Sequence, residues 1–124
     1  MLRGVRGAAP VDHNSSEAIL SAAELLMKAL IVANEIPAAS VSAVFFTVTP
    51  DLDACFPAEV RSRIGWNTVP FLCSQEIPVP GAMERVLRVL LLFETDRAQD
   101  EIRHCYLGAT IALRPDMHKQ EEKS

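Results

Sequence analysis

The spacing of hydrophobic and polar positions predicts one long helix near the start of the chain. Between residues 19 and 31, apolar side chains recur three or four positions apart, which places them on one face of an α-helix. Polar residues 14–16 supply an N-cap, and Glu17 suits the positive end of the helix dipole. The pattern ends near Asn34, so we expect a helix from about residue 17 to residue 34.

Other segments are rich in β-branched and aromatic residues, which is typical of strands. These predicted strands cover residues 2–11, 41–48, 68–73 and 85–95. Pro57 suits the first position of a short helix over residues 58–64, and Gly65 ends it. Residues 102–107 fit either a last strand or a helical turn, and the pattern of residues 108–113 favours neither.

The order of these elements predicts an α+β fold, in which helices cover one face of a mixed sheet. The 124 residues are enough for one domain, residues 1–124, and we expect its charged tail, residues 116–124, to be flexible. One long helix and one or two short ones cannot cover both faces of so hydrophobic a sheet. Since large exposed apolar areas usually mark interfaces, we expect the uncovered face to meet another subunit.

Composition narrows the classes of function. The net charge of −4 disfavours binding to nucleic acid or to an anionic membrane, and no apolar run approaches the length that spans a bilayer. The odd number of cysteines, three, favours a reducing compartment, so we expect a cytoplasmic protein. No glycine-rich phosphate loop and no paired spacing of histidines and cysteines occurs, so neither a nucleotide nor a metal is expected.

Arg88 stands in the most hydrophobic stretch of the chain, residues 86–93, which predicts a strand buried on both faces. A guanidinium stays charged near neutral pH, so its burial is costly unless an anion meets it. Two interpretations stay open: a permanent ion pair, with Glu76 or Glu94 as partner, or a cation kept for an anionic ligand. Nine of the twelve basic residues are arginines, which suit planar contacts with carboxylates and favour small anionic ligands.

Four further residues carry an open choice between structure and function. Glu76 lies between a predicted strand and a proline-rich segment, where its carboxylate could form an ion pair or accept a hydrogen bond from a ligand hydroxyl. Arg6 lies between two glycines and could be a ligand contact or an exposed terminal residue. Cys73 could fill a small apolar space or belong to a site, and Tyr106 could donate a hydrogen bond in the core or to a carboxylate.

Several motifs, taken together and in order, resemble the monofunctional chorismate mutases of the trimeric α+β class. They are residues 3–8, 46–52, 56–58, 75–76, 88–89, 100–107 and 113–116, and the resemblance covers residue 2 to about residue 117. It implies a homotrimer with a barrel-like (pseudo-α/β-barrel) core and active sites in clefts between adjacent subunits. It also implies conversion of chorismate to prephenate by a [3,3] rearrangement in phenylalanine and tyrosine biosynthesis, without a cofactor.

The resemblance also implies roles for individual residues. Arg88 matches the arginine that faces the ether oxygen of the breaking C–O bond, and Glu76 matches the carboxylate that binds the ring hydroxyl. Arg6 and Tyr106 match groups that hold a substrate carboxylate, and Cys73 matches a residue near the same hydroxyl as Glu76.

The walls of the cleft follow from the same resemblance. The matching wall residues are Phe56, Ala58, Leu72 and Leu113, and Arg114 matches a basic residue near the cleft. Where the family has an arginine in the segment after Phe-Pro-Ala, this chain has Ser62, flanked by Arg61 and Arg63. Either arginine could substitute if the short helix turns slightly, and the choice between them stays open.

Overall fold

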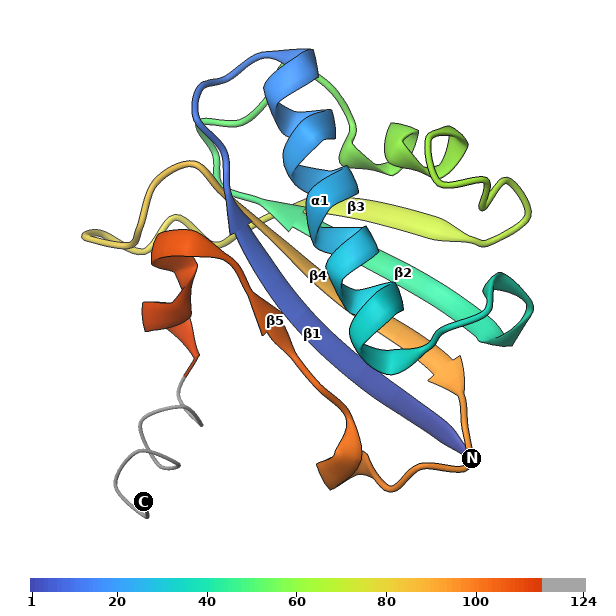
Figure 1. Ribbon diagram of the computed structural model, residues 1–124. Helices are drawn as coiled ribbons and strands as arrows, with labels where there is room; N and C mark the ends of the chain where they lie inside the picture. Colours follow the sequence, from blue (N-terminus) through green and yellow to red (C-terminus); the bar gives the residue numbers. More distant parts are fainter. Residues whose placement is uncertain (115–124) are drawn as a thin grey trace.

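A computed structural model describes residues 1–114, and the predicted flexible tail over residues 116–124 lies outside them (Figure 1). The strands and the α-helix are β1 (Leu2–Pro10), α1 (Ser16–Asn34), β2 (Val41–Val48), β3 (Phe71–Gln75), β4 (Val86–Glu94) and β5 (Cys105–Tyr106). Short 3-10 helices join them: η1 (Ala38–Ser40), η2 (Pro57–Ser62), η3 (Gln99–Glu101) and η4 (Gly108–Leu113). Within residues 1–114, no helix is long and apolar enough to cross a membrane.

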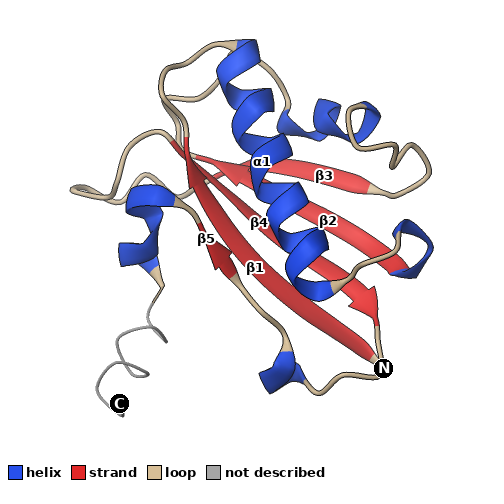
Figure 2. Ribbon diagram, viewed as in Figure 1, coloured by secondary structure: helices blue, strands red, loops and turns tan. Residues whose placement is uncertain are grey.

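The strands form one mixed sheet in the order β3-β2-β4-β1-β5 (Figure 2). The central strand β4 runs antiparallel to both of its neighbours, β1 and β2. The two outer strands pair in parallel, β5 with β1 and β3 with β2. This mixed sheet with one long helix and several short ones confirms the predicted α+β class.

Helix α1 covers one face of the sheet (Figure 1) and confirms the helix predicted from residue 17 to residue 34. Its N-terminus is capped by Ser15, whose hydroxyl oxygen accepts a hydrogen bond from the backbone N–H of Ala18. Its apolar stripe packs against alternate residues of the strands beneath it, and this contact forms the core of the domain. The buried side chains include Ile19, Leu26, Met27 and Leu30 of α1 and Leu87, Val89, Leu91 and Phe93 of β4.

Gly7 allows β1 to lie close to both α1 and β5. A Cβ atom at this position would lie 2.7 Å from the carbonyl oxygen of Cys105 and 2.9 Å from Cδ1 of Leu26, closer than van der Waals contact permits. The neighbouring Arg6 donates its backbone N–H to Nδ1 of His104 over 3.0 Å. The strand that carries Arg6 is therefore tightly fixed against the segment that leads into β5.

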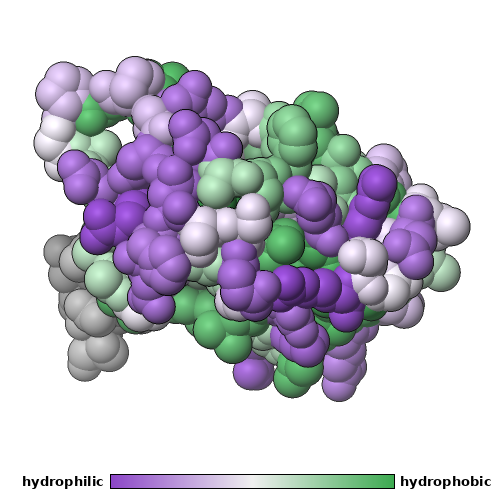
Figure 3. Space-filling model, turned by 90° about the horizontal axis from the view of Figure 1, so that it is seen from above, coloured by the Kyte–Doolittle hydropathy of each residue, from purple (hydrophilic) through white to green (hydrophobic). Residues whose placement is uncertain are grey.

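The opposite face of the sheet carries no α-helix in the described part of the chain, and we call it the open face. Paired residues of adjacent strands lie on the same face of a sheet. Leu90 of β4 pairs with Arg6 of β1 and with Phe45 of β2, and Phe45 pairs in turn with Leu72 of β3. These four residues therefore share the open face. Leu72 is 62% exposed and Leu90 39%. Hydrophobic side chains also reach the surface among hydrophilic ones on the side seen from above in Figure 3.

The open face corrects the expectation that β4 is buried on both faces. In the described chain, buried and accessible residues alternate from Leu87 to the end of β4, and the side chain of Arg88 is 42% exposed. The apolar run did not predict this alternation, because Leu90 and Leu92 are apolar but lie on the face that α1 does not cover. The expectation that helices leave one face of the sheet uncovered agrees with the structure.

The remaining differences concern boundaries. Strand β3 begins at Phe71 and not at residue 68, because residues 66–69 form a turn closed by a hydrogen bond from Val69 N–H to the Trp66 carbonyl. The predicted short helix after Pro57 is a 3-10 helix, and Gly65 follows it with a φ of 73°. The ambiguous segments at 102–107 and 108–113 contain the two-residue strand β5 and the 3-10 helix η4.

Candidate active site

Three side chains from three strands or their ends meet on the open face, and we call them the Arg88 cluster: Arg88, Glu76 and Thr47. Arg88 on β4 pairs in register with Thr47 on β2. Glu76 follows β3 directly, and its N–H donates to the Val48 carbonyl over 2.9 Å, which continues the pairing of β3 with β2. Oε2 of Glu76 lies 3.1 Å from Nε of Arg88 and accepts a hydrogen bond of 2.9 Å from the Thr47 hydroxyl.

The ion pair leaves the Arg88 guanidinium available to a ligand. The N–H of Nε is not directed at the Glu76 oxygen, so this buried nitrogen makes no hydrogen bond despite the short distance. Within residues 1–114, the guanidinium has no other ion-pair partner, and its side chain is 42% exposed. Because a pair so exposed is screened by water, it contributes at most about 1 kcal/mol to stability. Glu76 thus orients Arg88 without enclosing it.

A pocket of about 270 Å³ opens beside Glu76 and Arg88. Its other walls come from residues 49–51 and from the loop at 77–84. The base of this loop is fixed by Asp51, whose two carboxylate oxygens accept the N–H of Arg85 over 3.3 and 3.0 Å. Arg85 has a left-handed backbone, with a φ of 49°, that these bonds hold in place. The pocket therefore lies next to an accessible cation, and the base of its loop is held by Asp51.

Arg6 and Tyr106 extend the cationic and polar region toward the other edge of the sheet. Ala8 of β1 pairs with Arg88 on one side and with Tyr106 on the other, so the three share one row across the sheet. The guanidinium of Arg114 lies 6.0 Å from the centre of the Tyr106 ring, within the range of a cation–π contact. Leu113 is partly buried at the end of η4, next to Arg114.

A second group of predicted site residues lies around η2, beyond β3. Phe56, Ala58 and Arg61 line a small pocket of about 220 Å³, together with Glu59. Phe56 is 72% exposed, which is unusual for so large an apolar side chain. We call Phe56, Ala58 and Arg61 the Phe56 group. None of them lines the pocket beside Arg88.

The structure separates the two arginines that flank Ser62. Arg63 turns toward α1, where its guanidinium lies 2.8 Å from Oε2 of Glu17 and 3.5 Å from Oε1 of Glu24. Hydrogen bonding to Glu17 raises the pKa of Arg63, and the contact with Arg63 lowers the pKa of Glu17. Arg61 instead lines the pocket of the Phe56 group.

Cys73 lies on the helix-covered side of β3, paired with the buried Phe46, and so faces away from Arg88. Burial raises the pKa of its thiol, and burial likewise raises the pKa of Cys55 and Cys105. A thiol with a raised pKa stays protonated at neutral pH and is a poor nucleophile. This environment favours a packing role for Cys73 beside Phe56, with which it lines a pocket of about 830 Å³.

Comparison with known proteins assigns the family. The sequence pattern of the family "Chorismate mutase type I" matches residues 2–117. This chain belongs to that family. The chorismate mutase AroH of Thermus thermophilus is 45% identical over 122 residues, which cover 98% of this chain and 100% of the relative. The chorismate mutase AroH of Bacillus subtilis is 41% identical over 118 residues, or 94% of this chain and 93% of the relative.

A solved structure agrees with the sequence relatives. The chorismate mutase from Clostridium thermocellum superposes with a TM-score of 0.86 at 34% sequence identity, and the match covers 88% of this chain and 97% of that one. These findings confirm the resemblance seen in the sequence motifs. The chain is accordingly a chorismate mutase, an isomerase, of the monofunctional class.

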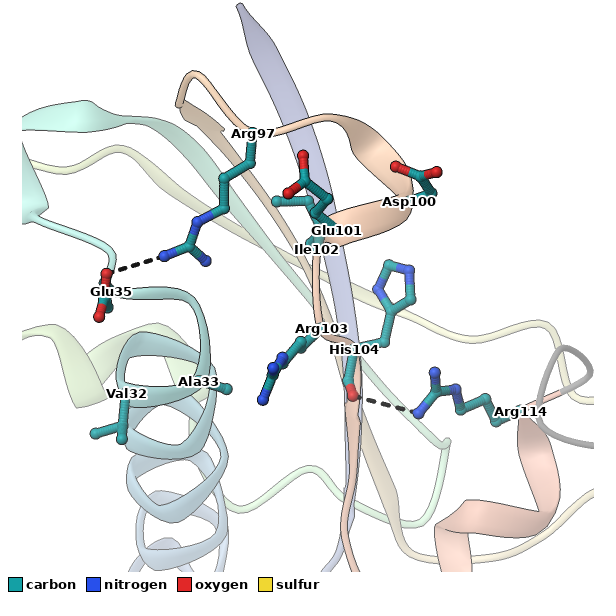
Figure 4. A pocket seen from close by; sticks show the side chains of 10 residues that line it. All are labelled: Val32, Ala33, Glu35, Arg97, Asp100, Glu101, Ile102, Arg103, His104 and Arg114. Atoms are coloured by element: carbon teal, nitrogen blue, oxygen red, sulfur yellow. Dashed lines mark hydrogen bonds and ion pairs between the residues drawn. The ribbon is translucent and has the colours of Figure 1, made fainter. Parts of the chain in front are cut away.

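The chorismate mutase chain has a larger pocket, of about 1020 Å³, away from the Arg88 cluster (Figure 4). It lies between the C-terminal end of α1 and residues 97–104, and Arg114 is the only predicted site residue that lines it. An ion pair of 3.0 Å joins Arg97 to Glu35 across its rim, and Asp100 and Glu101 offset its other cations. Its lining therefore carries both charges, and it includes neither Arg88 nor Glu76.

Sequence reasoning missed Thr47. A threonine within a β-branched strand looks like an ordinary strand former, so nothing in its local pattern distinguishes it. Its position opposite Arg88 follows only from the pairing of β2 with β4. Among residues 1–114, no group of three or more histidine, cysteine, aspartate or glutamate side chains is arranged to hold a metal ion.

Proposed function

We propose that this chorismate mutase converts chorismate to prephenate at a site built around Arg88 and completed by a neighbouring copy of the chain. The observation that carries the proposal is the accessible guanidinium of Arg88, oriented by Glu76 beside a pocket on the open face. We infer the substrate from the relatives named above, which are chorismate mutases. The accessible cation can stabilise the negative charge that develops in this reaction.

The [3,3] rearrangement breaks a C–O bond and forms a C–C bond in one step, without proton transfer or a covalent intermediate. Negative charge gathers on the ether oxygen as the C–O bond lengthens. A preorganised guanidinium in a partly dry pocket stabilises that charge better than water does, because it does not have to reorient. By analogy with oxyanion-hole donors, Arg88 contributes about 3–4 kcal/mol to the barrier reduction. No cofactor takes part in this scheme.

The other residues of the proposed site bind and orient the substrate. Chorismate carries two carboxylates and a ring hydroxyl, and it reacts only from a compact conformer. Glu76 accepts a hydrogen bond from the hydroxyl, while Arg6 and Tyr106 hold one carboxylate. Arg114 adds positive charge near the same edge. Fixing the reactive conformer in this way lowers the entropic part of the barrier.

The neighbouring copy supplies the Phe56 group. Within one chain, Arg88 and the Phe56 group lie at separate pockets, so neither encloses a ligand by itself. The open face, with Leu72 62% exposed, provides an apolar surface for association. We propose that three copies bury these faces in a barrel-like core and bring Arg61 of one subunit to Arg88 of the next. The three unpaired cysteines suit a cytoplasmic setting, where the product feeds phenylalanine and tyrosine synthesis.

Two measurements test this proposal. The first follows the loss of chorismate absorbance with the purified protein, and an inactive wild-type protein would overturn the function. The second mixes Arg88→Ala chains with Arg61→Glu chains, each expected to be inactive alone, after partial unfolding and reassembly. In a randomly mixed trimer, roughly a quarter of the clefts combine an intact Arg88 with an intact Arg61, so about that share of activity should return.

The control for the mixing experiment is reassembly of each variant alone, which should restore no activity. If mixed trimers form but activity does not return, Arg61 and Arg88 act within one chain, and the shared site is wrong. Light scattering after size exclusion reports whether the assembly contains three chains.

A further inference from the structure

Thr47 has a place in the Arg88 cluster that the proposed chemistry does not yet use. Its hydroxyl donates a hydrogen bond of 2.9 Å to Oε2 of Glu76, the same oxygen that lies 3.1 Å from Nε of Arg88. Thr47 pairs in register with Arg88 on one side and with Ser74 on the other. It is therefore held in an interior strand of the sheet, whereas Glu76 lies just beyond the end of β3.

The contact decides how the Glu76 carboxylate is turned. The last torsion of a glutamate side chain has a broad, roughly two-fold profile, so the backbone alone does not fix the plane of the carboxylate. Thr47 and Arg88 both lie against Oε2. Oε1 has no hydrogen-bond or ion-pair partner within residues 1–114, and the side chain retains 18% exposure at the pocket. The arrangement leaves one oxygen for Arg88 and the other for a ligand.

Threonine suits this task for two reasons. It is β-branched, so few side-chain rotamers are available in a strand and the hydroxyl direction is preset. Its hydroxyl is a neutral donor, so it holds the carboxylate without competing as a cation for the charge that orients Arg88. A lysine or arginine at this position would instead form a second ion pair with Glu76.

We propose that Thr47 is a positioning residue, whose hydroxyl fixes the Glu76 carboxylate so that one oxygen orients Arg88 and the other faces the substrate hydroxyl. This inference rests on the proposed function, because it names a further residue of the same site. Thr47 itself touches neither the substrate nor the reacting atoms. It acts through Glu76.

The test compares Thr47→Val, which replaces the hydroxyl by a methyl group of similar size, with Thr47→Ser, which keeps the hydroxyl. We expect Thr47→Val to lower kcat/KM about tenfold, as expected for loss of a hydrogen bond to a charged group, and Thr47→Ser to retain most of the activity. The matched control is Ser74→Ala, which removes an exposed hydroxyl from the same row of the sheet and should leave kcat/KM unchanged.

A double-mutant cycle distinguishes positioning from a general structural effect. In a Glu76→Ala background, Thr47→Val should cause no further loss of kcat/KM, because the group that Thr47 positions is gone. An equal tenfold loss in both backgrounds, or wild-type kinetics for Thr47→Val, would overturn the proposal. If Thr47→Val does not fold, Thr47→Ala carries the same comparison.

The same cycle read by urea unfolding does not depend on activity. Thr47→Val and Glu76→Ala should then be non-additive in stability, because each removes the same hydrogen bond. If the wild-type protein fails to turn over chorismate, the proposed function fails, while the unfolding cycle still decides whether Thr47 holds Glu76. Additive effects on unfolding would refute the contact itself.

Discussion

Replacing Arg88 by lysine separates two contributions of this side chain, its positive charge and its planar set of donors. Lysine keeps the charge, so we expect the variant to bind the chorismate dianion nearly as well as the wild-type protein. A single ammonium on a flexible stem cannot reproduce the direction of the guanidinium toward the ether oxygen. The loss should therefore fall mainly on kcat.

The size of the effect differs between stability and catalysis. The Arg88 end of the ion pair is 42% exposed, so losing the pair lowers the free energy of unfolding by no more than about 1 kcal/mol. Loss of one preorganised donor to the transition state costs about 3–4 kcal/mol, or a factor of roughly 100 to 1000 in kcat. Arg88→Lys should accordingly fold normally and turn over at least about 100-fold more slowly.

Chorismate loss at saturating substrate measures kcat, and urea unfolding of the same preparation measures stability. Arg85→Lys is the matched control, since it makes the same substitution three positions away, next to the pocket but with its side chain outside it. The control should leave kcat unchanged. Turnover of Arg88→Lys within about threefold of the wild-type rate would refute the electrostatic role of Arg88.

Three other predictions, two of them with a control substitution, test separate parts of the structure. Leu90→Asp places a charge on the open face and should shift the assembly to monomers on size exclusion. The control is Val32→Asp on α1, which should not do so, because Val32 is 78% exposed and lies away from the open face. Arg61→Ala should raise KM several-fold and leave the free energy of unfolding unchanged. Arg63→Ala breaks contacts with two glutamates of α1, so it should lower the free energy of unfolding slightly and leave KM unchanged. Burial raises the pKa of Cys73 above the ordinary thiol value near 9. The protonated thiol therefore contributes fully to the free energy of unfolding below that value, and this contribution is lost as pH rises through the folded-state pKa. Cys73→Ala should remove part of that fall in urea unfolding measured between about pH 8 and about pH 10.

Local signals predicted the elements whose causes are local. Helix α1 follows its apolar spacing and its serine cap closely, and β2 has the predicted bounds of residues 41 and 48. The strand predicted at 68–73 is displaced, because its start depends on the parallel pairing of Phe71 with Val44, a partner far away in the sequence. Pairing between distant strands is not encoded in the composition of either strand alone.

The candidate site shows the same division. The sequence drew attention to Arg88 and Glu76 because charges beside apolar strands are costly. It could not show that Arg88 is partly exposed, because the exposure follows from α1 covering only one face. The different surroundings of Arg61 and Arg63 also required the fold, since the glutamates that pair with Arg63 lie on α1, far from it in the sequence.

In the proposed assembly, β4 contributes both to the active site and to the contact between subunits. Arg88 and Leu90 are two positions apart on the same side of β4, so a shift in how two protomers press together also displaces the guanidinium. Conditions that loosen quaternary contacts, such as strong dilution or a little urea, should then slow turnover before any protomer unfolds. Specific activity would then decrease as the enzyme is diluted, so a dilution series reports whether the assembly remains intact.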